Sequence, residues 1–212
     1  MSLPHLPTKE YLQSILKDGD TKLRILCSAC LHGRACGWDA TNNGEYPVAH
    51  KLITHPRVEV VPFCPEDFAY GTPRDMSDIH GGNGYDVLDG KAKVLSEKGE
   101  DWTEGMVNAA HKMLALAQKE NVHLALLLDM SAACGSQVIY DGNRFAEEKK
   151  YQIGAGVAAA QLMRAGFKVI SQRDYASLEI LYSLIDDNHT IDTKAIDHHQ
   201  TDWYKQYFSV PH

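Results

Sequence analysis

Three of the five cysteines, Cys30, Cys64 and Cys134, each follow an apolar run of the chain by a few residues. Runs of this kind are typical of buried strands in a parallel sheet. Ligands of such sheets bind just beyond the carboxyl ends of the strands, so the loops that carry these cysteines are expected to meet along one edge. Three thiolates suit zinc or an iron–sulfur cluster, and a set of three leaves one coordination position open for substrate or water.

Other interpretations of the cysteines remain open. Cysteine is among the most frequently buried residue types, and most buried cysteines are inert. Cys27 and Cys30, followed by Cys36, also resemble a local metal or redox motif, although Cys27 lies within an apolar run and is expected to face the core. Five is an odd number, and a chain of 212 residues can build a core without disulfides.

The elements that must position these cysteines are predicted from hydrophobic periodicity. Strands are expected at residues 23–27, 58–63, 122–128 and 167–170, and helices at residues 8–17, 103–120, 154–165 and 175–185. This alternation predicts one Rossmann-like α/β domain with a mainly parallel sheet flanked by helices.

The domain is expected to cover residues 1–185. Residues 71–90 are rich in Gly, Pro and Asp and are predicted to be mostly loop. A polar tail, residues 186–212, shows little sign of fixed structure, and its adjacent His198 and His199 are expected to be solvated rather than to bind a metal.

Composition excludes several classes of protein. The chain has 21 Lys and Arg against 28 Asp and Glu, a net charge of -7, and no basic cluster, which argues against a nucleic-acid partner. No run of 18 apolar residues occurs, so no membrane-spanning segment is expected. The first residues lack the apolar core of a secretion signal, and a cytoplasmic protein is expected. The sequence does not indicate an oligomeric state.

The glycine-rich segment Gly81-Gly82-Asn83-Gly84 superficially resembles a nucleotide-binding loop. It follows no predicted strand and opens no predicted helix, so it does not meet the requirements of a dinucleotide fingerprint.

Six short motifs together resemble the family long described as domain of unknown function 523, some members of which are thiouracil desulfidases. In chain order they are Ser28-Ala29-Cys30-Leu31-His32-Gly33, Cys64-Pro65-Glu66, Thr72-Pro73-Arg74, the segment from Gly81 to Gly90, Ser131-Ala132-Ala133-Cys134-Gly135 and Tyr140-Asp141-Gly142. They appear in the order of the family and cover about residues 23–171.

The resemblance implies a [4Fe-4S] cluster held by Cys30, Cys64 and Cys134, with one iron free of protein ligands. It further implies that Glu66 and Ser131 are catalytic and that Asp39 helps to hold the substrate, while Arg74 is a candidate for binding an anionic group. The implied reaction replaces the sulfur of a thiolated pyrimidine base or nucleoside with oxygen and releases sulfide.

Each of these four side chains also has an ordinary explanation. Glu66 could serve as an acidic residue in the first turn of a helix that begins near Pro65. Ser131 and Asp39 could stabilise turns, and Arg74 could pair with a carboxylate.

The sequence departs from the family in the expected pocket. Met130 stands where the family usually has Lys, Ala132 and Ala133 replace Pro and Ser, and residues 35–47 form a longer loop. These differences leave the substrate open. The alternatives are a desulfidase for thiolated tRNA nucleotides, a non-catalytic metal-binding sensor or scaffold with zinc as a possible occupant, or a metal-free pocket for a phosphorylated or purine ligand.

Overall fold

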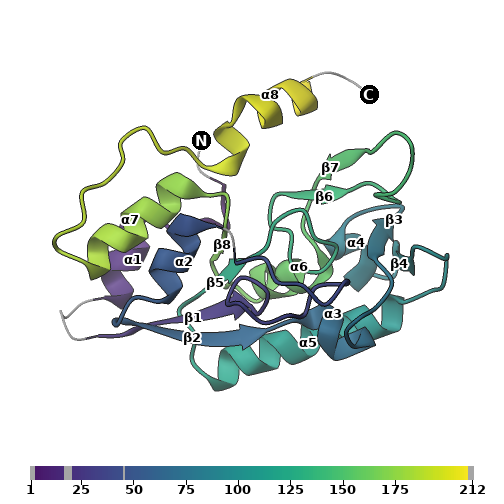
Figure 1. Cartoon of the computed structure of the whole chain (residues 1–212), viewed down its shortest axis with the longest axis horizontal. Coiled ribbons are helices and arrows are strands. Elements are labelled where there is room, and N and C mark those ends of the chain that lie inside the picture. Colours follow the sequence, from purple (N-terminus) through teal and green to yellow (C-terminus); the bar gives the residue numbers. More distant parts are fainter. Residues whose placement is uncertain (1–2, 17–20, 45, 210–212) are drawn as a thin grey trace.

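The structure is a computed structural model that describes residues 3–16, 21–44 and 46–209. At its centre lies a parallel sheet of four strands, β1 (Leu23–Ser28), β2 (Val58–Phe63), β5 (Leu124–Leu127) and β8 (Val169–Ser171), in the spatial order β2-β1-β5-β8 (Figure 1). Leu26 of β1 pairs with Val61 of β2 and with Ala125 of β5. The predicted α/β class with a mainly parallel sheet is therefore confirmed.

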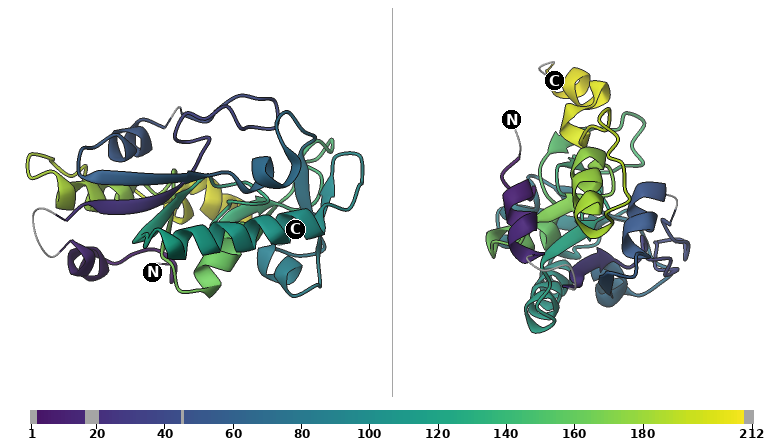
Figure 2. Two further views of the ribbon diagram at one scale, coloured as in Figure 1. Left: turned by 90° about the horizontal axis from the view of Figure 1, so that it is seen from below. Right: turned by 90° about the vertical axis from the view of Figure 1, so that its left-hand side faces the viewer.

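Side chains of the central strands alternate between two apolar cores, one on each face of the sheet. Leu26, Ala125 and Leu127 pack on the face covered by α5 (Thr103–Lys119) and α6 (Val157–Arg164). Ile25 and Leu126 face the other side, which is covered by α2 (Pro47–Ile53) and α7 (Tyr175–Ile185). Helix α1 (Lys9–Ile15) packs against α7. Figure 2 shows the long helix α5 running along the sheet.

Smaller elements surround the carboxyl edge of the sheet. Helix α3 (Pro65–Tyr70) follows β2 directly and packs against α5. Two antiparallel hairpins lie on the same side of the molecule: β3 (Ser77–His80) with β4 (Lys93–Ser96), and β6 (Val138–Tyr140) with β7 (Tyr151–Ile153) (Figure 1). Helix α4 (Gly84–Leu88) connects the strands of the first hairpin and packs against α6.

The strand order creates a topological switch point between β1 and β5. From β1 the chain proceeds to β2 on one side, whereas β5 and β8 lie on the other side. Loops that leave the carboxyl ends of β1 and β5 therefore diverge and leave a crevice, which is where open α/β sheets bind their ligands.

Residues 71–90 are more ordered than the sequence analysis predicted, because they contain β3 and α4. Asn83 caps α4: its side chain accepts a hydrogen bond from Tyr85 N at 2.9 Å, and its own N–H donates to Asp86 Oδ2 at 2.9 Å. This capping box begins a helix of five residues, which is too short for hydrophobic periodicity to reveal.

The expectation that the tail lacks fixed structure is also wrong. Asp197 and His198 are buried, a 3-10 turn covers His198–Gln200, and α8 (Asp202–Ser209) follows. The tail passes over α7 before it reaches α8, which lies at the top of the view in Figure 1 and contacts β7. His198 is only 3 % exposed, so the prediction that it is solvated is wrong; its partner, the carboxylate of Asp129, lies 69 residues earlier in the chain.

Within the described part of the chain, no helix is long and apolar enough to cross a bilayer.

Candidate active site

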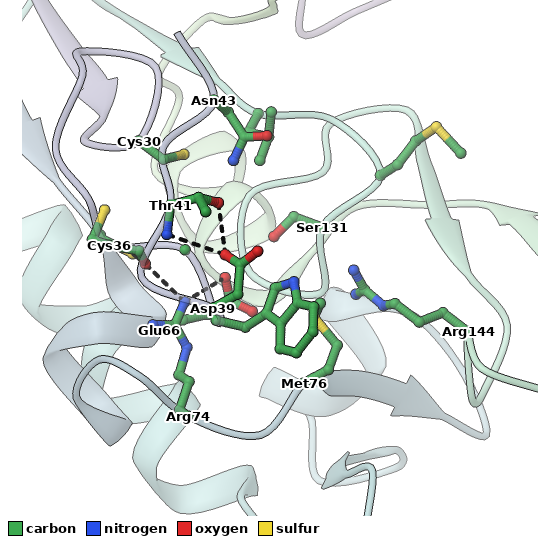
Figure 3. A pocket seen from close by; sticks show the side chains of 15 residues that line it. Cys30, Cys36, Asp39, Thr41, Asn43, Glu66, Arg74, Met76, Ser131 and Arg144 are labelled. Atoms are coloured by element: carbon green, nitrogen blue, oxygen red, sulfur yellow. Dashed lines mark hydrogen bonds and ion pairs between the residues drawn. The ribbon is translucent and has the colours of Figure 1, made fainter.

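A cavity of about 320 Å³ lies at the carboxyl edge of the sheet, at the switch point. Its walls come from the loop after β1, the start of α3, the segment before β3, the loop after β5 and the loop between β6 and β7 (Figure 3). All four side chains to which the sequence analysis assigned a role in catalysis or substrate binding line it: Asp39, Glu66, Arg74 and Ser131.

The three predicted metal ligands lie at or next to this cavity. Cys30 follows β1 and Cys64 follows β2, and both line the cavity. Cys134 lies in the loop after β5, is 5 % exposed, and is close enough to Cys64 and Glu66 for their charges to influence its pKa. The crevice thus gathers residues that are separated by 34 and 70 positions in the sequence.

A fourth cysteine, Cys36, belongs to the same group. It is 1 % exposed, lines the cavity, and its thiol interacts with the thiols of both Cys30 and Cys64. From the sequence, Cys36 was expected only as part of a local motif with Cys27 and Cys30. Cys27 instead lies within β1, is fully buried in the core, and does not line the cavity.

The environments of Cys36, Cys64 and Cys134 favour the neutral form of their thiols. The thiol of Cys36 and burial raise the pKa of Cys64, and interaction with the Cys30 thiol raises the pKa of Cys36 to about 11. Burial also raises the pKa of Cys134. Because metals bind the thiolate, loading this site with metal must release protons.

Cys64 also begins helix α3. Its side chain is the N-cap and accepts a hydrogen bond from Asp67 N at 3.4 Å, and Pro65 occupies the first position of the helix. This local geometry directs Glu66, in the first turn, toward the cavity.

Glu66 is held from two directions by neighbouring side chains. Its Oε1 accepts a hydrogen bond from Ser77 Oγ at 3.0 Å, and its Oε2 lies 3.5 Å from Arg74 Nη2. The side chain is 17 % exposed, so the carboxylate can reach a bound molecule while it stays anchored.

The guanidinium of Arg74 is 4 % exposed and is used mainly within the protein. It donates to the carbonyl oxygens of Gly71 at 3.0 Å and Cys36 at 3.1 Å, and to Thr72 Oγ1 at 3.0 Å. Arg74 therefore connects the loop that carries Cys36 to the carboxylate of Glu66.

Ser131 stabilises the loop that carries Cys134. Its Oγ accepts hydrogen bonds from the backbone N–H groups of Ala133 at 3.2 Å and Cys134 at 3.1 Å. The turn-forming role considered from the sequence is thus present in the structure. Because both bonds use the oxygen as acceptor, the hydroxyl proton is still available to a molecule in the cavity.

Asp39 lies at the mouth of the cavity, between Glu66 and Ser131 in Figure 3. Its Oδ1 accepts hydrogen bonds from Thr41 Oγ1 at 2.6 Å and Thr41 N at 3.1 Å. These two bonds lower the pKa of Asp39, so its exposed carboxylate is ionised at neutral pH.

Arg144, which was not predicted from the sequence, lines the wall opposite the cysteines (Figure 3). A partly buried ion pair holds it: Arg144 Nη2 lies 2.6 Å from Asp78 Oδ1, and its backbone N–H donates to Asp78 Oδ2 at 2.9 Å. Arg144 comes two residues after the Tyr140-Asp141-Gly142 motif, which was the available signal.

Comparisons with known proteins agree with this geometry. A family model described as 2-thiouracil desulfurase matches residues 25–174. The uncharacterized protein YbbK of Bacillus subtilis (strain 168) is 38 % identical over 151 residues, which is 71 % of this chain and 96 % of that protein. The solved structure of TudS, a [4Fe-4S]-dependent thiouracil desulfidase, superposes with a TM-score of 0.60 at 29 % identity and covers 77 % of this chain and 99 % of TudS.

The family match ends at Asp174, just before α7, so α7 and the tail lie beyond it. The match includes every residue that lines the cavity and more than half of the chain. From the matched sequence, the shared fold and the motifs around the cavity, we conclude that this chain belongs to the 2-thiouracil desulfurase family.

Proposed function

We propose that this chain is an iron–sulfur-dependent desulfidase, which replaces the sulfur of a thiolated pyrimidine base or nucleoside with oxygen and releases sulfide. The observation that carries the proposal is the cavity itself, where three cysteines from three separate loops lie next to the anchored carboxylate of Glu66. The structural likeness to TudS supports the same assignment.

The donor set is compatible with a [4Fe-4S] cluster bound by Cys30, Cys64 and Cys134. A single tetrahedral zinc ion, with Zn–S bonds of about 2.3 Å, needs its sulfurs about 3.8 Å apart. In the described part of the chain, the sulfurs of Cys30, Cys64 and Cys134 do not all lie within 4.8 Å of one another. This wider spacing supports a cluster over a single zinc ion.

The chemistry that a bound cluster supplies is Lewis-acid attraction for the soft sulfur of a thiocarbonyl group. We assign the proton transfers to Glu66, which can accept a proton from the attacking water and return it later. Arg74 and Ser77 keep this carboxylate in the wall of the cavity.

Two further side chains are proposed to hold the substrate. The hydroxyl of Ser131 can donate a hydrogen bond, and the ionised carboxylate of Asp39 can accept one from a ring N–H of the base. The guanidinium of Arg74 makes most of its contacts with protein atoms, which supports a role in positioning Glu66; its direct contact with substrate remains a prediction.

The acidic charge of the chain and the size of the cavity support a free base or nucleoside as substrate over a tRNA. A cavity of about 320 Å³ is at the small end of typical ligand pockets.

The test is anaerobic reconstitution, followed by iron and sulfide analysis and by assays of sulfide release from thiouracil and thiouridine. We expect about four irons per chain in wild type and in Cys27→Ala, and loss of the cluster in Cys64→Ala. Glu66→Gln should keep its iron while kcat falls about 10²–10⁴-fold, whereas Glu104→Gln, on the exposed surface of α5, should leave kcat unchanged.

A fully loaded wild type that releases no sulfide from either compound would overturn the proposed activity and favour a sensor or scaffold. A Cys64→Ala variant that keeps all its iron would overturn the ligand assignment.

A further inference from the structure

A second group of potential metal ligands lies where the tail meets the start of α7. Asp174 immediately precedes α7, while Asp197 and His199 belong to the tail. One side-chain oxygen or nitrogen of each residue lies within 4.8 Å of those of the other two. None of the three lines the cavity described above.

Within the part of the chain that the structure describes, the imidazole of His199 has no hydrogen-bond partner. Both ring nitrogens are shielded from solvent, and neither forms a hydrogen bond with any described residue. Buried ring nitrogens normally have a hydrogen-bond partner or bind a metal, because losing water without a replacement is costly. A neutral imidazole always has one nitrogen with a free lone pair, which is the form that metals bind.

The two carboxylates are fixed in place by neutral donors. Asp174 accepts hydrogen bonds from Gln137 Nε2 at 2.6 Å, Ser171 N at 2.7 Å and His198 N at 3.1 Å. Asp197 accepts from the backbone N–H and the hydroxyl of Ser177, each at 2.9 Å. Asp197 also accepts a hydrogen bond from the backbone N–H of Gln200. A carboxylate has about four acceptor sites, so each of the two, with three hydrogen bonds, keeps one site for a metal, and outer hydrogen bonds of this kind orient the carboxylates that bind metals.

The negative charge at this place lacks a matching cation. Among the described residues, neither Asp174 nor Asp197 forms an ion pair with Lys or Arg. Burial and the nearby charges of Asp197 and Asp129 raise the pKa of Asp174 to about 6. A bound cation would remove this repulsion.

We propose that Asp174, Asp197 and His199 bind one divalent transition-metal ion, which fastens the tail to the start of α7. Two carboxylates and an imidazole are a donor set that suits Zn²⁺ or Mn²⁺. With bonds of about 2.1 Å, tetrahedral ligands lie about 3.4 Å apart, so the side chains need to approach one another by little more than about 1 Å. This site is independent of the cluster and of the proposed reaction, because it shares no residue with the cavity.

The test uses Mn²⁺, because manganese prefers oxygen and nitrogen donors and will not compete for the cysteines. The full chain is stripped with a chelator and titrated with Mn²⁺, and the loss of the free-ion electron paramagnetic resonance signal counts the ions bound. His199→Ala is the central variant. The His199 ring forms no hydrogen bond within the described protein, so its removal should not release the tail.

We expect wild type to bind one Mn²⁺ per chain. A free Mn²⁺ concentration of about 100 times the Kd should raise Tm by about 5–10 °C. His199→Ala should weaken binding at least about 100-fold, since even outer-shell changes cost 10–100-fold. His111→Ala, which removes an exposed histidine of α5, should bind as wild type does, and so should Cys64→Ala.

Three results would overturn the proposal: no binding to wild type at millimolar Mn²⁺, equal binding to His199→Ala, or binding that depends on Cys64. None of them bears on desulfidase activity, so the two proposals stand or fall separately.

Discussion

The buried pair of Asp129 and His198 should contribute strongly to stability, because it connects the tail to the loop that carries Cys134. His198 Nδ1 lies 2.6 Å from Asp129 Oδ2, and the two side chains are 4 % and 0 % exposed. Although burial raises the pKa of Asp129, its bond to His198 and backbone hydrogen bonds keep it below the usual value, so the carboxylate is ionised. A buried charge that loses its partner typically costs 3–5 kcal/mol.

The expected cost of His198→Leu can be placed within that range. Asp129 Oδ1 would still accept hydrogen bonds from Ser136 N at 2.9 Å and Gln137 N at 3.2 Å, which keeps the cost near the lower end. We expect a loss of about 3 kcal/mol in the free energy of unfolding, or about 6–12 °C in Tm for a chain of this size. Leu preserves much of the volume packed against Trp203, whose ring stacks 5.6 Å from that of His198.

The assay is urea unfolding of wild type, His198→Leu, Asp129→Asn and the double variant, together with hydrogen exchange of the tail. His111→Leu serves as a surface control and should stay within about 0.5 kcal/mol of wild type. A coupling energy below about 0.5 kcal/mol between the two positions would refute the reasoning, since groups in direct contact normally couple more strongly. Unchanged exchange of the tail amides in His198→Leu would contradict the claim that this pair holds the tail.

Three other predictions follow from single contacts. In metal-free protein, Cys36→Ala removes the main cause of the raised pKa of Cys64, so Cys64 should react faster with an alkylating agent at neutral pH. Peptide mass spectrometry measures the rate of alkylation, and an unchanged rate would contradict this prediction. Burial lowers the pKa of His5 to about 4, so the native protein loses stability as the pH falls from about 6.5 to about 4. Over this window His5→Gln should flatten the pH dependence of the unfolding free energy by up to about 3 kcal/mol. A profile of the variant that runs parallel to that of wild type would refute this prediction. A Cβ at Gly156 would lie 2.6 Å from backbone atoms of the loop that carries Cys134, so Gly156→Ala should lower the free energy of unfolding by about 1–3 kcal/mol and reduce iron retention. Gly44→Ala, where the nearest atom is 3.5 Å away, should do neither. Equal iron content in the two variants would contradict the argument.

Much of the fold was predictable because its signals are local. The strands at β1, β2, β5 and β8 are apolar runs, and the helices at α5, α6 and α7 have helical periodicity over eight residues or more. Other elements could not be found in this way, because they lack a sufficient local pattern. Strand β4, for example, is stabilised by pairing with β3, and helix α4 depends on its capping box and on its packing against α6.

The motifs of the candidate site were predicted from the sequence, but the hydrogen bonds and ion pairs between their side chains were not. Glu66 was identified from the motif that it shares with Cys64, yet its anchoring by Arg74 and Ser77 depends on the way the chain turns after α3. Cys36 was given no role in the pocket because nothing in its local sequence distinguishes a cysteine that faces a cavity from one in the core.

The residues that follow the carboxyl ends of the strands were predictable without the structure, because strand length and hydrophobic order are encoded within short segments. Cys30, Cys64 and Cys134 could therefore be grouped before any coordinates were known. The folded structure was needed to show that Cys36 joins them, that His198 is buried against Asp129, and that His199 faces Asp174 and Asp197. These contacts join residues that no repeating sequence pattern connects. Whether such a polar side chain hydrogen-bonds to water or to another residue depends on its burial in the folded chain.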